Sequence, residues 1–115
     1  MYKDIASHSA LVGAIVGAGG YEGQAAADHA AHASHLAAER EAHHDLQLAQ
    51  VELYCDHQAQ ALVAIRHAMQ LLEACADKAL EPQLAALSEA AWHVRHNESL
   101  VAVALLDRTK DQLHA

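Results

Sequence analysis

The chain has 115 residues, a length that fits one domain with a modest core. Its formal net charge is −8 with histidine neutral, and its seven Lys and Arg residues are scattered, which excludes the basic patch of a nucleic-acid-binding surface. Hydrophobic residues make up 53% of the chain, yet aromatic residues make up only 3% and many of the others are alanine, so the expected core has small side chains.

Residues 4–18 form a short apolar stretch that predicts a helix. Gly19 and Gly20 are expected to end this helix, and residues 21–23 are expected to continue as a turn. Gly13 and Gly17 would share one face of this helix, as in the close-packing pairs of membrane helices. The apolar run is too short to span a bilayer, and the N-terminus has no convincing secretory signal. Close packing inside a soluble bundle is therefore the preferred interpretation.

Residues 24–80 contain neither glycine nor proline, which predicts long helices. Within this region, residues suited to a core recur in alternating steps of three and four, as in a coiled-coil seam interrupted only by a glutamine. The predicted seam comprises Leu48, Val51, Cys55, Gln58, Leu62, Ile65, Met69, Leu72, Ala76 and Ala79. The same register extends backwards through Ala27, Ala30, Ser34, Ala37, Glu41 and His44. Either one very long helix runs through, or two helices meet near 43–45 with Asp45 as the N-cap; typical helix lengths favour the break.

Pro82 marks the next boundary, and a further helix is predicted to follow it. One apolar stripe on this helix comprises Leu84, Leu87, Ala91, Val94, Val101 and Leu105, and a second comprises Trp92, Ser99, Val103 and Leu106. A helix with two apolar faces contacts more than one neighbour. We therefore predict an all-α fold, an antiparallel bundle of about four long, heptad-patterned helices in a single domain over residues 1–115, which forms a homodimer. Its core should place Leu62, Ile65, Met69 and Leu72 against Leu84, Leu87 and Val94.

Five of the eleven histidines lie in one stretch, DHAAHASHLAAEREAHHD, over residues 28–45. On a helix, side chains of metal-ligating type fall within an arc of about 80°. This face comprises Asp28, His32, His35, Glu39 and His43. Such ligands suit Zn, Cu, Ni or Fe. In the alternative interpretation the alanines opposite, which share the register of the seam, pack on the core, and the histidine face is merely solvated.

One helix supplies only part of a coordination sphere. If the chain folds back near Asp45, His57 comes level with His32 and His35 and could complete the site. A second candidate cluster comprises Glu89, His93 and His96, again one helical face. Its alternative is an amphipathic outer surface with a tryptophan packed nearby.

The function predicted first is the binding of divalent transition-metal ions through histidine- and glutamate-rich helix faces, as a buffer, carrier or sensor. The alternative is an acidic protein-interaction module with a titratable surface, because protonation of all eleven histidines would move the net charge from −8 to +3. A third hypothesis, and the only enzyme among them, is a di-iron bundle built on Glu41-x-x-His44 and Glu98, in which a two-fold dimer would supply two copies of each. A function other than catalysis is favoured.

Cys55 and Cys75 would be separated by about 30 Å on one helix, too far to form a disulfide. Free cysteines favour a reducing, cytoplasmic location. Neither nucleic acid nor a membrane is expected as a partner.

Overall fold

The computed structural model describes the backbone of residues 21–113 and the side chains of Ala27 and residues 29–113. The helix predicted at 4–18 and its Gly-Gly end lie outside the described residues. The elements are helix α2 (Tyr21–Tyr54), helix α3 (Gln58–Ala74), the 3₁₀ turn η1 (Lys78–Leu80), helix α4 (Glu81–Arg95) and helix α5 (Ser99–Gln112). Every regular element from residue 21 to 113 is helical, which confirms the all-α class. Because α2 begins at Tyr21, the turn predicted at 21–23 is wrong.

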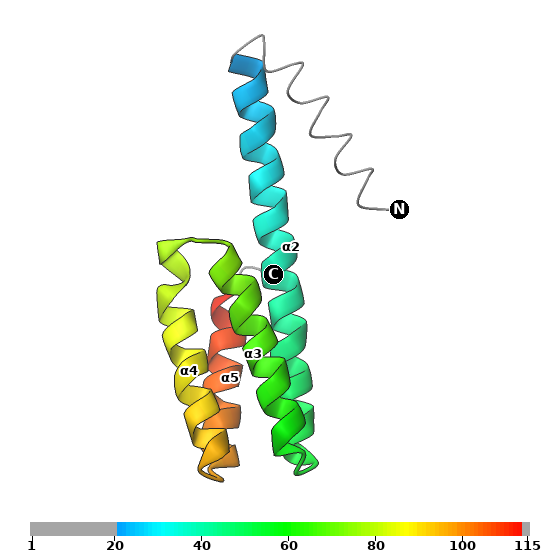
Figure 1. Ribbon diagram of the computed structural model, residues 1–115, viewed down its shortest axis with the longest axis vertical. Coiled ribbons are helices and arrows are strands. Elements are labelled where there is room, and N and C mark those ends of the chain that lie inside the picture. Colours follow the sequence, from blue (N-terminus) through cyan, green and yellow to red (C-terminus); the bar gives the residue numbers. More distant parts are fainter. Residues whose placement is uncertain (1–20, 114–115) are drawn as a thin grey trace. The chain divides into compact units, whose positions relative to one another are not determined.

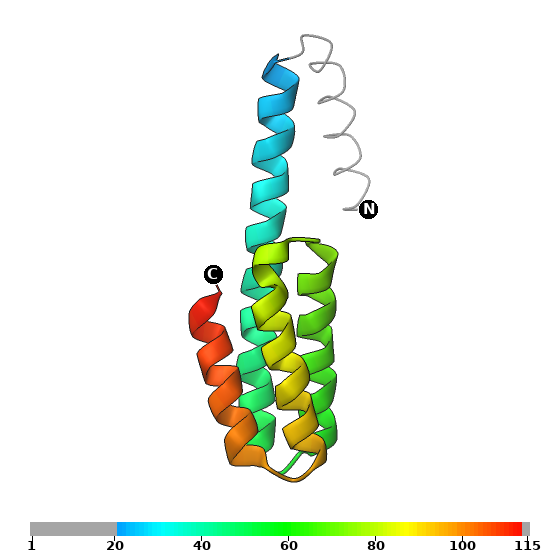
Figure 2. The same cartoon turned by 90° about the vertical axis from the view of Figure 1, so that its left-hand side faces the viewer.

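The chain divides into two compact units, Met1–His35 and Leu36–Ala115, and α2 contributes to both. In the second unit the rest of α2 packs with α3, α4 and α5, and consecutive helices run in opposite directions (Figures 1 and 2). The antiparallel arrangement of four helices is therefore confirmed. Whether the whole chain behaves as one domain stays a prediction.

The core of the second unit draws apolar side chains from all four helices. Ile65 and Leu72 of α3 are buried, as are Leu87 and Val94 of α4, and the partly buried Leu62, Met69 and Leu84 pack against them. The predicted contact across the α3–α4 turn is thus confirmed. On the other side of the bundle, the Gln50 amide nitrogen donates a hydrogen bond to the carbonyl of Val103 at 3.2 Å and so joins α2 to α5.

The first break between helices lies at residues 55–57, not at 43–45. Asp56 has a φ of 62°, in the left-handed region that ends helices. The amide of His57 donates to the carbonyl of Glu52 at 2.8 Å, and that of Asp56 to Leu53 at 3.1 Å, so the last carbonyls of α2 are satisfied. Aspartate tolerates this conformation better than most residues, which allows a helix end without glycine.

A second end of the same kind divides the region after Pro82. Asn97 has a φ of 61°, and the amide of Glu98 donates to the carbonyl of His93 at 2.9 Å. The single helix predicted there is wrong, because α4 and α5 are separate and pack on each other. In the second apolar stripe that argued for a dimer, Leu106 is buried and Val103 is partly buried within the chain, whereas Trp92 is 47% exposed, so most of that face is covered by this packing. Dimerisation stays a prediction, without that support.

The predicted seam is correct in the middle of α3 and wrong in α2. Leu48 and Val51 are 43% and 52% exposed, and Cys55, Ala76 and Ala79 are also exposed. The buried positions in the described part of α2 are instead Glu39, Ala42, Leu46, Ala49, Gln50 and Leu53. A heptad register continues only while the helix does, and the reversal at Asp56 ends it. The larger side chains of Leu48 and Val51 favoured the wrong stripe, whereas alanines lie on the buried one.

The α3–α4 connection contains Ala76, whose φ is 51°. Asp77 then caps η1, its carboxylate accepting from the amide of Ala79 at 2.9 Å. Pro82 lies in the first turn of α4, where its missing N–H costs nothing, so the predicted boundary is confirmed. No helix between residues 21 and 113 is both long enough and apolar enough to cross a membrane.

Candidate functional site

The histidine-rich stretch is helical throughout, as predicted, and lies within α2. The predicted ligands along it differ in burial: His32 is exposed and His35 partly exposed, whereas Glu39 is 1% exposed. The side chain of Asp28 lies outside the described part of the chain. His43 is partly exposed on the side of α2 that carries Gln50. The four predicted ligands whose side chains are described therefore do not share one environment.

In the alternative interpretation of this face, the placement of the alanine side in the core is wrong. Ala27, Ala30, Ala33 and Ala37 are exposed, and Glu39 belongs to the buried stripe. The Glu39 carboxylate lies close enough to Cys75 to affect its chemistry. Burial, then the negative charges of Glu39 and Asp77, raise the pKa of the Cys75 thiol. Glu39 is thus a group of the bundle interior near the α3–α4 turn.

His57 lies just after the C-terminal end of α2, whereas His35 lies near the middle of that helix. The chain reverses at Asp56 and not at Asp45, so α2 runs on past the predicted turn and His57 does not fold back beside the histidine-rich stretch as expected. The Nδ1 atom of His57 lies 2.8 Å from Oε1 of Glu52. The condition on which His57 would complete a site with His32 is therefore not met.

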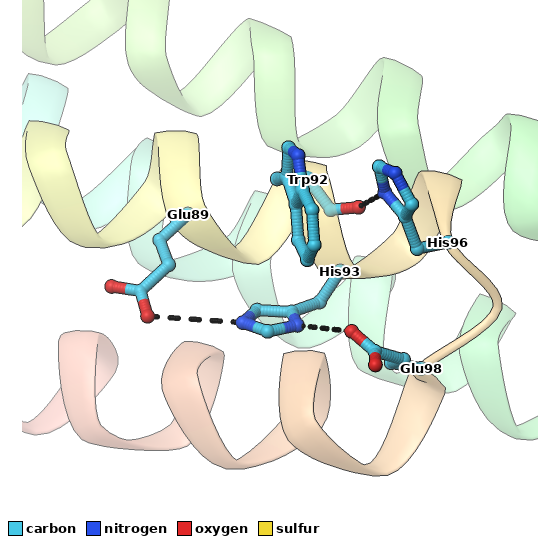
Figure 3. Close-up of polar contacts among 5 residues, drawn as sticks. All are labelled: Glu89, Trp92, His93, His96 and Glu98. Carbon is cyan, nitrogen blue, oxygen red and sulfur yellow. Dashed lines mark hydrogen bonds and ion pairs between the residues drawn. The ribbon is translucent and has the colours of Figure 1, made fainter.

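In the second predicted cluster, His93 lies between two carboxylates (Figure 3). Its Nδ1 is 2.6 Å from Oε1 of Glu98, and its Nε2 is 3.7 Å from Oε2 of Glu89. A neutral imidazole carries one N–H, so only the protonated ring can offer a proton to both carboxylates. The two carboxylates lie on opposite sides of the ring and do not converge on one point.

His96, the third member of that cluster, is turned away from His93. Its Nδ1 is 2.7 Å from the carbonyl oxygen of Trp92, and its ring stacks on the indole at a centroid distance of 3.8 Å. The edge of the His93 ring meets the same indole, at 5.1 Å and an interplanar angle of 90°. Figure 3 shows His93 directed toward α5 and His96 on the far side of the indole. The arrangement is an aromatic and ion-pair cluster that joins α4 to the start of α5.

A histidine outside the predicted clusters occupies a similar position between α2 and α3. The Nδ1 atom of His67 is 2.5 Å from Oδ2 of Asp45, and its Nε2 is 4.0 Å from Oε2 of Glu41. Asp45 and His67 each lie eleven residues from Asp56, so the antiparallel turn brings them level. Residue spacing alone does not predict this pair, since the pairing depends on the position of the turn.

An open groove lies beside this pair, with a volume of about 460 Å³. We call it the α2–α3 groove; it is lined by Asp45, Leu48, Glu52, Gln60, Val63, Ala64 and His67. Leu48 is 43% exposed and Val63 is 64% exposed, so apolar side chains face solvent here. The His67–Asp45 pair contributes to the lining, and so does Glu52, the partner of His57.

The di-iron arrangement is not assembled in the described residues. Glu41 and His44 are exposed on α2, and Glu98 is exposed where it pairs with His93. Ligands of such a centre must point into the bundle.

Within residues 21–113, no group of three or more His, Cys, Asp or Glu side chains is placed to hold a metal ion. No family model matches the chain, and no curated protein and no solved structure matches it.

Proposed function

We propose that this protein is an interaction module whose α2–α3 groove binds an amphipathic helix of another protein. The partner helix carries aliphatic side chains on one face and Lys or Arg along its borders. The observation that carries the proposal is an exposed apolar floor lying between carboxylates. The metal-binding function expected from the sequence would need ligands beyond those that one chain gathers in its described part.

The floor of the groove supports a helix-in-groove mode of recognition. Leu48 from α2 and Val63 from α3 are large aliphatic side chains, exposed to 43% and 64%, with Ala64 buried between the helices. Helix-binding grooves take apolar side chains spaced one turn apart on the incoming helix. The groove is open and has a volume of about 460 Å³, so it leaves room for side chains of an incoming helix.

The charges around the groove favour a basic partner. Asp45 and Glu52 line it, Glu41 lies beside it, and no Lys or Arg is among its lining residues. A partner with Lys or Arg at its borders would be steered to this surface and oriented on it. A second copy of the chain, with a net charge of −8, would bring like charge to the same place.

The compartment proposed for this interaction is a reducing one such as the cytoplasm. Cys55 and Cys75 are both free thiols, and Cys55 is exposed. An exposed thiol persists most readily where disulfides are kept reduced.

The test uses two short synthetic helical peptides with the same leucine face, one bordered by lysine and the other by glutamate. Binding to the full chain is measured by calorimetry at moderate ionic strength. The lysine-bordered peptide is expected to bind, and Val63→Lys should weaken it by about tenfold or more, because a charge replaces an apolar contact at the centre of the site. Val63 is exposed, so this variant keeps the fold.

Leu100→Lys is the matched control, since Leu100 is 80% exposed on α5, outside the groove lining. It adds the same charge and should leave peptide binding unchanged. Equal binding of the two peptides, or equal losses in the two variants, would overturn the proposal. Self-association of the parent chain that Val63→Lys abolishes would instead make the groove an interface between copies, and would also overturn it.

A further inference from the structure

We infer that two copies of this chain bind one transition-metal ion between their α2 helices, through His32 and His35 of each copy. This site is distinct from the α2–α3 groove and does not depend on the function proposed for it. The inference begins from one feature, a histidine-bearing length of helix whose side chains face solvent.

From residue 29 to residue 34 every side chain of α2 is exposed, and His35 is partly exposed. His32 and His35 lie three residues apart on this helix, so their β-carbons are about 5–6 Å apart on one face. Two imidazoles at this spacing can contact the same ion. Imidazole is a preferred ligand of Zn, Cu and Ni. Neither ring is buried, so an ion in solution can reach both.

The coordination number requires a second copy. A structural zinc site takes four ligands in a tetrahedron, and the His32–His35 pair supplies two of them. Glu39, the next candidate along the face, is 1% exposed and belongs to the bundle interior, so it does not extend the set. Two-fold symmetry repeats His32 and His35, and the four imidazoles fill the sphere with no further residue type.

The surface around the pair suits a second copy. Between Ala27 and His35 the sequence is ADHAAHASH, with Asp28 as its one formal charge when histidine is neutral, so two such segments repel each other little. Apart from Asp28 and the three histidines, its side chains are Ala and Ser, which let helix axes approach closely.

The experiment measures the mass of the full chain by light scattering after gel filtration, in chelator and at increasing zinc. The expected result is a monomer in chelator and a dimer with zinc, with one zinc bound per two chains. His32→Ala/His35→Ala should remain monomeric at every zinc concentration. The matched control, His44→Ala/His96→Ala, removes the same number of exposed imidazoles and should dimerise like the parent.

Three results would overturn the inference. The first is a dimer that persists in chelator, because the ion would not then be what joins the copies. The second is zinc-dependent dimerisation of His32→Ala/His35→Ala. The third is an equal loss of zinc affinity in both double variants, which would mean diffuse binding by surface imidazoles. None of these results bears on peptide binding in the α2–α3 groove, so the two proposals fail separately.

Discussion

Replacing Ala76 with glycine should stabilise the protein. Ala76 has a φ of 51° in the turn between α3 and α4, and its side chain is exposed, so the substitution removes no core contact. A residue with a β-carbon in the left-handed region costs about 1–2 kcal/mol. Glycine relieves that cost but lowers the free energy of the unfolded chain by about 0.4–1 kcal/mol through its greater freedom. The net expected gain in the free energy of unfolding is about 0.5–1 kcal/mol.

For a domain of this size such a gain raises Tm by about 2–8 °C. The assay is thermal unfolding of the full chain followed by circular dichroism at one protein concentration, with chelator present. Ala85→Gly is the matched control, because Ala85 is also exposed but lies inside α4, where glycine costs about 1 kcal/mol. The two variants should therefore move Tm in opposite directions. A fall in Tm for Ala76→Gly comparable with that for Ala85→Gly would refute the assignment of a left-handed helix end at this position.

Two further predictions concern the core and the thiols. Ile65→Ala should lower the free energy of unfolding by about 2–5 kcal/mol, since Ile65 is fully buried, and an unchanged Tm would contradict its place in the core. Iodoacetamide at neutral pH should label the exposed Cys55 before Cys75, whose pKa is raised by burial and by Glu39 and Asp77; equal labelling rates would contradict this environment. Native Cys75 holds its proton to a higher pH than Cys75 in the unfolded chain, because its pKa is raised on folding. Its contribution to stability is therefore full below the unfolded pKa of 9.0 and is lost as the pH rises through the native pKa. Cys75→Ala should accordingly make the free energy of unfolding fall less steeply at alkaline pH.

The fold class follows from features that are local in the sequence. Apolar residues spaced by three and four around Ile65 and Leu72 predict a helix whose buried face is correct, because no turn interrupts the register there. Pro82 predicts a helix start for a covalent reason, the missing N–H, that tertiary packing does not change. Such signals remain valid whatever the rest of the chain does.

The errors come from helix ends that lack glycine. Asp56 and Asn97 adopt the left-handed conformation through side chains that tolerate it, and neither breaks the hydrophobic pattern strongly enough to mark a turn. Once the first turn is misplaced, His57 is assigned to the wrong end of α2, and the pairing of His67 with Asp45 cannot be found. The candidate sites depend on contacts between helices, so they could be only partly predicted, whereas the helical class could be predicted well.

Alanine accounts for eight of the seventeen buried hydrophobic residues in the described core. Positions such as Ala42, Ala61 and Ala90 are fully buried, and at each of them an added methyl group would have to push one helix away from another. In most small domains sequence variation is restrained at the largest interior residues. Here the restraint falls on the smallest interior residues. In related sequences, the substitutions tolerated at these alanine positions would be those that do not increase side-chain volume.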